Sequence, residues 1–62
     1  MTLNEFERKL KYKFSVQEML DVYPVVSKYG LWEEFIYSYH SAMDCGQTHP
    51  SAIYHALEEW DL

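Results

Sequence analysis

The sequence is poor in residues that form crosslinks, interrupt helices or carry positive charge. It has one cysteine, two glycines, two prolines and five lysines or arginines. Because Cys45 stands alone, no disulfide forms within the chain, which excludes a disulfide-stabilised secreted scaffold and favours the reducing cytoplasm. No apolar run approaches the ~18 residues that a membrane-spanning helix needs. The opening segment, Met1–Glu7, carries two acidic residues instead of the apolar core of a signal peptide. We therefore expect a cytoplasmic protein without membrane contact.

The chain of 62 residues suffices for one domain, which we expect to span residues 1–62. A domain of this size buries only about 60% of the surface that its unfolded chain exposes, so its core is thin. The aromatic content of 18% compensates in part, because each buried ring removes roughly 150–250 Å² from water. Self-association or a bound partner would complete the core further.

Charge is distributed unevenly along the chain. The formal net charge is −5, yet four of the five basic residues fall between Arg8 and Lys13. Beyond Phe14 the only base is Lys28, against eight acidic residues. The sequence thus predicts a short basic segment followed by a strongly acidic remainder.

Two capping boxes predict where the first helices begin. Thr2 precedes Glu5 by three positions, a spacing at which a hydroxyl and a carboxylate cap the first helical turn reciprocally. We expect this first helix to run from about Leu3 to Leu10. Ser15 and Glu18 repeat the spacing, so a second helix is expected directly after Ser15.

The second predicted helix contains a proline. Because proline lacks an N–H and disfavours helical geometry in the residue before it, we expect a break near Val22–Tyr23. A short helical turn over Pro24–Lys28 then ends at Gly30, which can adopt the left-handed conformation. The apolar residues of this segment lie at helical spacing and are expected in the core: Val16, Met19, Leu20, Tyr23, Val26 and Tyr29.

The segment Leu31–Leu62 predicts a helical hairpin that turns at Cys45-Gly46-Gln47. One helix is expected from about Leu31 to Asp44, and another, capped by Thr48, to about Trp60. Each has an apolar stripe at the i, i+3, i+4, i+7 spacing of a one-sided helix. The stripes comprise Trp32, Phe35, Ile36, Tyr39 and Met43, and Ile53, Ala56, Leu57 and Trp60. The predicted fold is all-α, a compact bundle of three to four short helices with a C-terminal hairpin.

The outer faces of this hairpin are acidic and carry two tyrosines where the pattern calls for polar residues. Tyrosine among carboxylates is typical of recognition surfaces, because the ring supplies contact area at little cost in entropy. We expect these residues to bind a protein partner with a basic surface, without catalysis or cofactor. The candidate residues are Glu33, Glu34, Tyr37, Tyr54, Glu58 and Glu59. The alternative is that they only keep the protein in solution.

Two further function classes remain open at this stage. The hairpin has the outline of a DNA-reading helix-turn-helix, but its second helix exposes carboxylates, which a polyanion repels. A DNA-binding regulator would instead use the basic segment, Arg8, Lys9, Lys11 and Lys13. The third class is a self-assembling module, for which a homodimer is the simplest form.

The histidines and the cysteine gather near the predicted turn. A zinc site usually pairs its ligands at short spacings, and the series His40, Cys45, His49, His55 does not do so. A thiolate of Cys45 activated by His49 is conceivable, but no glycine-rich oxyanion loop accompanies it. We therefore predict neither a metal site nor a catalytic residue.

The run Gly46-Gln47-Thr48-His49-Pro50-Ser51-Ala52, leading into Ala56–Leu62, resembles the ends of small helical proteins carried by bacteriophages and other mobile elements. The resemblance covers 17 residues, Gly46–Leu62. It implies a small, acidic, non-enzymatic protein that acts by binding a host protein, such as a nucleic-acid enzyme or a transcription factor. It assigns no functional residue.

Overall fold

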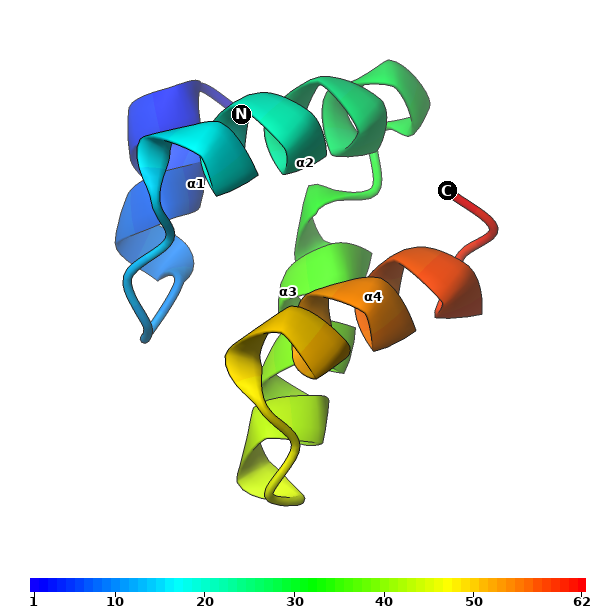
Figure 1. Ribbon diagram of the computed structural model, residues 1–62. Helices are drawn as coiled ribbons and strands as arrows, with labels where there is room; N and C mark the ends of the chain where they lie inside the picture. The colour runs from blue at the N-terminus through cyan, green and yellow to red at the C-terminus, as the bar shows by residue number, and fades with distance from the viewer.

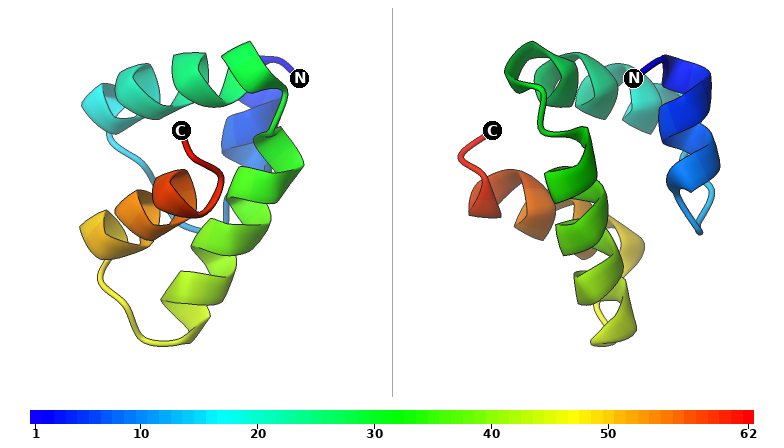
Figure 2. Two further views of the ribbon diagram at one scale, coloured as in Figure 1. Left: turned by 90° about the vertical axis from the view of Figure 1, so that its right-hand side faces the viewer. Right: turned by 180° about the vertical axis from the view of Figure 1, so that it is seen from behind.

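A computed structural model describes all 62 residues and contains four helices and no strand (Figure 1). The helices are α1 (Leu3–Lys9), α2 (Val16–Tyr29), α3 (Trp32–Asp44) and α4 (His49–Glu59). In Figures 1 and 2, α2 lies across the end of the molecule where α3 begins, and α4 packs against the side of α3. The predicted all-α fold with a C-terminal helical hairpin is confirmed.

The helix starts follow the predicted caps. Both capping boxes form, Thr2 with Glu5 and Ser15 with Glu18. In each, the hydroxyl accepts from the backbone N–H of the glutamate, and the glutamate carboxylate accepts from the backbone N–H of the capping residue. The Thr48 hydroxyl caps α4 by accepting from the Ser51 N–H. At the other end of α2, Gly30 adopts φ = +65°, as a left-handed helix stop requires.

The predicted break before Pro24 is wrong, because α2 continues through the proline without interruption. Because proline has no N–H, the Leu20 carbonyl lacks its helical donor. Both residues lie on the exposed side of the helix, where a carbonyl without that donor is accessible to solvent. On the opposite face Val22 and Val26 are buried. Burying two valines stabilises by about 3–6 kcal/mol, enough to offset the ~3 kcal/mol that an interior proline costs.

The core is one cluster of twelve buried apolar residues contributed by all four helices and the α1–α2 connection. They are Phe6, Leu10, Phe14, Met19, Val22, Val26, Phe35, Ile36, Tyr39, Ala42, Ala52 and Ala56. Three residues predicted for the core are exposed instead: Val16 (77%), Leu20 (61%) and Tyr29 (57%). The prediction failed because the apolar arc of α2 is wider than the surface that the core covers, so its period alone does not say which row faces inward.

The hairpin follows its predicted stripes more closely. Phe35, Ile36 and Tyr39 are buried, while Ile53 and Leu57 are half-buried against the core. Small residues at the contact, Ala42, Ala52 and Ala56, are buried and let the two helices approach closely. Trp60, predicted as the last stripe residue, lies at the edge with 37% of its surface exposed.

Candidate functional site

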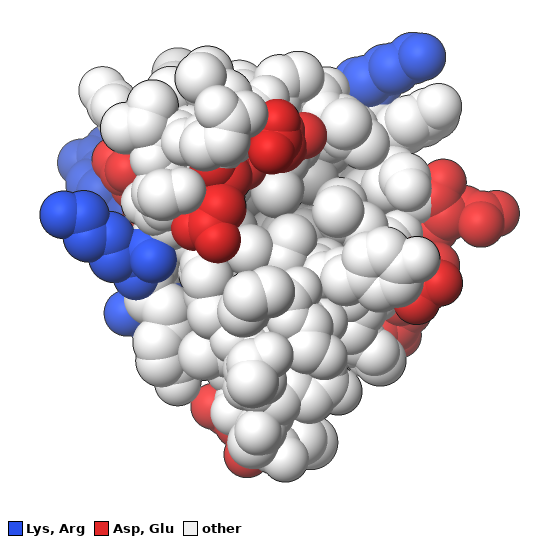
Figure 3. Space-filling model, viewed as in Figure 1, with Lys and Arg blue, Asp and Glu red and all other residues white.

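The candidate site is the outer surface of the α3–α4 hairpin. The Trp60 indole N–H donates to the Ser38 hydroxyl at 2.8 Å, which fixes the end of α4 against the middle of α3. Glu34 lies one turn before the buried Ser38 and is itself half-buried, so it lies at the edge of the contact between α3 and α4. Glu58 and Glu59 are exposed in the last turn of α4. We call Glu34, Glu58 and Glu59 the acidic face; in Figure 3 acidic side chains gather over the C-terminal end of α4.

Glu33, the fourth predicted carboxylate, faces the other way. Its Oε1 lies 2.8 Å from the Nζ of Lys9 on α1. Glu33 and Ser38 lie roughly 140° apart around α3 at 3.6 residues per turn, and α1 and α4 flank opposite sides of α3 in Figure 1. The structure thus separates Glu33 from the acidic face.

The two predicted tyrosines are the most exposed aromatic side chains of the chain, Tyr37 at 75% and Tyr54 at 63%. Tyr37 lines a shallow pocket of about 310 Å³ with His40, Ser41 and Asp44. Tyr54 lies one turn before Glu58 on α4, and Tyr37 lies one turn after both Glu33 and Glu34 on α3. Each exposed ring therefore has a carboxylate of the acidic face as its helical neighbour.

The carboxylates of α4 lie at the end of the helix where negative charge is least favourable. The carbonyl end of a helix carries partial negative charge, which favours cations there. The last turn of α4 contains Glu58 and Glu59 and no basic residue, and Asp61 follows it. His55 Nε2 lies 3.4 Å from a Glu59 carboxylate oxygen and is the only cationic group paired with this end, when protonated. Each such carboxylate costs about 0.3–1 kcal/mol at low ionic strength.

Asp61 is also the one non-glycine residue with positive φ, at +60°. Aspartate tolerates this conformation better than most side chains, but glycine or asparagine is the usual choice after a helix. The end of α4 therefore combines unfavourable charge with an uncommon backbone conformation.

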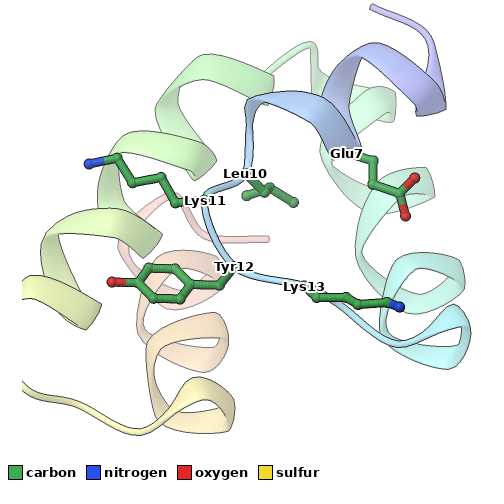
Figure 4. Close-up of a pocket in the computed structure, with 5 residues that line it drawn as sticks. All are labelled: Glu7, Leu10, Lys11, Tyr12 and Lys13. Carbon is green, nitrogen blue, oxygen red and sulfur yellow. The ribbon is translucent and has the colours of Figure 1, made fainter.

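The basic segment does not converge on one point. Lys9 pairs with Glu33, while Lys11 and Lys13 line a shallow pocket of about 500 Å³ together with Glu7, Leu10 and Tyr12. Figure 4 shows the side chains of Lys11 and Lys13 pointing away from each other, with the Glu7 carboxylate on the side of Lys13. With Arg8, also exposed, they form a dispersed positive side of the molecule, at the left in Figure 3.

The histidines and Cys45 do not gather into one site, and no three His, Cys, Asp or Glu residues lie close enough to hold a metal ion. Cys45 is exposed, and His55 contacts Glu59. His40 Nε2 accepts from the Lys11 backbone N–H at 3.1 Å. Burial, followed by the nearby Lys11 charge, lowers the pKa of His40 and keeps its ring neutral.

His49 connects three helices through a hydrogen-bonded chain that sequence reasoning missed. Its Nδ1 lies 2.7 Å from the Tyr39 hydroxyl and its Nε2 lies 3.0 Å from a Glu18 carboxylate oxygen. This geometry fits a neutral ring that accepts from Tyr39 and donates to Glu18. The Ser15 backbone N–H and then His49 lower the pKa of Glu18, while burial raises the pKa of Tyr39 to about 12. These hydrogen bonds connect α2, α3 and α4, and the Tyr39 side chain within them is fully buried.

Comparisons with known proteins assign no family to the chain. No protein-family model matches it, and no curated protein or solved structure is significantly similar to it. No helix has the length and apolar composition needed to cross a bilayer. Function is therefore inferred from the surface chemistry of the chain itself.

Proposed function

We propose that this protein is a small, non-enzymatic, cytoplasmic binding protein that captures and modulates a protein with a basic surface. The acidic face and the neighbouring rings of Tyr37 and Tyr54 form its contact surface. The observation that carries the proposal is the pair Glu58 and Glu59 at the carbonyl end of α4. Side chains that oppose the local helix electrostatics are typical of positions kept for function, since stability alone favours lysine or arginine there.

The charge of this surface indicates the chemistry of its partner. Carboxylates attract a cationic surface and raise the rate of encounter, and the tyrosine rings supply apolar area once contact forms. Basic surfaces of this kind are exposed by proteins that bind nucleic acid, because phosphates demand lysine and arginine. A nucleic-acid-processing enzyme or a transcription factor is therefore the partner that fits best. An acidic protein bound to its nucleic-acid-binding surface would inhibit it.

Two observations weigh against the alternative of a DNA-binding regulator that uses Arg8, Lys9, Lys11 and Lys13. Lys9 pairs with Glu33, and Lys11 and Lys13 point apart, with Glu7 on the side of Lys13. The phosphates of DNA would therefore contact dispersed cations and not one continuous basic site. Direct DNA binding would also weaken steeply with added salt, which separates it experimentally from protein capture.

The test is affinity capture from a nuclease-treated bacterial lysate. The double variant Glu58→Gln/Glu59→Gln is compared with the charge-matched control Glu7→Gln/Asp21→Asn, whose residues are exposed and lie off the hairpin. A stoichiometric protein retained by the wild type and the control, and lost by the hairpin variant, supports the proposal. Equal retention by all three proteins, or capture of nothing by any of them, contradicts it for this host.

A further inference from the structure

The shallow pocket on α3 presents polar groups that have no partner within the chain. It is lined by Tyr37, His40, Ser41 and Asp44, which enclose about 310 Å³. The side chains of Tyr37, Ser41 and Asp44 are exposed and make no hydrogen bond or ion pair. Their spacing of four and then three residues keeps them on one face of the helix. A phenol, a hydroxyl and a carboxylate are therefore free for a ligand at one place, which we call the α3 pocket.

We infer that the α3 pocket binds an arginine side chain of the partner protein. The inference rests on the proposed function, from which it takes a partner with a basic surface, and it adds the side chain that is recognised and the place where it binds. Tyr37 belongs both to the pocket and to the proposed contact surface, so the pocket adjoins that surface.

The electrostatics of the α3 pocket favour a cation. Asp44 is the last residue of α3, and the carbonyl end of a helix carries partial negative charge. The last turn of α3 contains no basic residue, and no lysine or arginine pairs with Asp44. The carboxylate and the helix end therefore attract the same cation, which the chain itself does not supply.

His40 adds no positive charge to the pocket at neutral pH. Its Nε2 accepts from the Lys11 backbone N–H at 3.1 Å, which a protonated ring nitrogen could not do. Burial, followed by the nearby Lys11 charge, lowers the pKa of His40 and favours the neutral ring. Lys11 itself does not line the α3 pocket. Asp44 is thus the only charged group in the lining.

The aromatic ring favours arginine over lysine as the bound cation. A guanidinium is planar and weakly hydrated, stacks on aromatic faces and binds a carboxylate through two parallel N–H bonds, whereas an ammonium is compact and strongly hydrated. Tyr37 supplies a ring that is 75% exposed. Because Tyr37, Ser41 and Asp44 line one pocket, a single guanidinium can contact the ring and the carboxylate, with the Ser41 hydroxyl as a further acceptor.

The experiment is an NMR titration of the full chain with three tripeptides blocked at both ends. They contain arginine, lysine or citrulline between two glycines, and citrulline is the neutral analogue of arginine. The arginine peptide should bind at millimolar concentration and shift the amide resonances of Tyr37, Ser41 and Asp44 most. It should bind at least about twofold more tightly than the lysine peptide, since an exposed cation–π contact contributes that much. The citrulline peptide should shift none of these resonances.

Two variants with matched controls test the residues of the pocket. Asp44→Asn and Tyr37→Leu should each weaken binding of the arginine peptide at least about twofold. Asp21→Asn and Tyr29→Leu make the same changes at exposed sites on α2 and should leave the affinity unchanged. Equal shifts with the arginine and citrulline peptides, or equal losses in the pocket variants and their controls, overturn the inference.

The lysate capture separates failure of this inference from failure of the proposed function. Asp44→Asn should retain less of the captured partner than Asp21→Asn does. A captured partner that requires Glu58 and Glu59, together with an arginine peptide that leaves the α3 pocket unshifted, overturns this inference alone. Binding of the arginine peptide in the pocket without any captured partner contradicts the proposed function alone.

Discussion

Helix α2 and the α3–α4 hairpin handle their apolar residues in opposite ways. In the hairpin the large apolar side chains, apart from the exposed Tyr37 and Tyr54, occupy one stripe of each helix, so helical period and burial agree. In α2 the apolar residues spread over a wider arc of the helix than the core covers, and the fold buries Val22 and Val26 while leaving Val16 and Leu20 exposed. A helix with a narrow apolar stripe thus specifies its inward face by its own sequence, whereas the inward part of a wide apolar arc is decided by the elements that pack on it.

The largest effect expected from this comparison lies in the hairpin core. Phe35 is fully buried between Phe6 and Tyr39. Phe35→Ala should cost about 3–5 kcal/mol, close to the total stability of a domain this small, so the variant should be largely unfolded. Tyr37→Ala, two residues along and 75% exposed, should change stability by no more than about 0.5 kcal/mol. Urea denaturation of the two variants measures both.

The assignment of the two faces of α2 is tested by a matched pair of truncations. Val26→Ala removes two methyl groups from the buried face and should destabilise by about 1–3 kcal/mol. Leu20→Ala removes more apolar atoms from the exposed row, yet should cost no more than about 0.5 kcal/mol in the monomer. Denaturation at low concentration separates folding from association. A greater loss for Leu20→Ala than for Val26→Ala would show that the faces are reversed.

Caps and stripes could be predicted because their signals are local. Thr2, Ser15 and Thr48 each precede their partner N–H by three residues, and Gly30 marks a helix end by its backbone freedom alone. The bond between His49 and Glu18 joins residues 31 positions apart, so no spacing rule announces it. The pairing of Glu33 with Lys9 likewise depends on where α1 lies against α3. Both contacts depend on how the helices pack in three dimensions, which no local sequence pattern encodes.

The chain of hydrogen bonds through His49 should have a smaller but measurable effect. His49→Ala leaves the buried Tyr39 hydroxyl without its partner, which should cost about 1–3 kcal/mol. His55→Ala is the control, because His55 is exposed and contacts only Glu59. Thermal unfolding compares the two, and equal midpoints would contradict a stabilising role for the His49 contacts.

The smallest predicted effect is a dependence of stability on mildly acidic pH through His40. Its pKa in the folded chain is lowered from 6.5, so between these two values the unfolded chain binds more protons. The stability contribution of neutral His40 is therefore complete above pH 6.5 and declines as the pH falls toward the folded pKa. Urea denaturation over this range should show a shallower decline for His40→Gln. An identical pH profile would contradict a lowered pKa of His40 in the folded chain.

The proposed function is tested most directly by measuring stability and partner affinity on the same Glu58→Gln/Glu59→Gln protein. Removing two carboxylates from the carbonyl end of α4 should leave the chain as stable as the wild type or more stable, by up to about 0.3–1 kcal/mol for each residue. Affinity for the captured partner should fall at least tenfold, because the same carboxylates contact its basic surface. A variant that gains stability and binds the partner as tightly as the wild type would contradict the claim that the acidic face exists for binding.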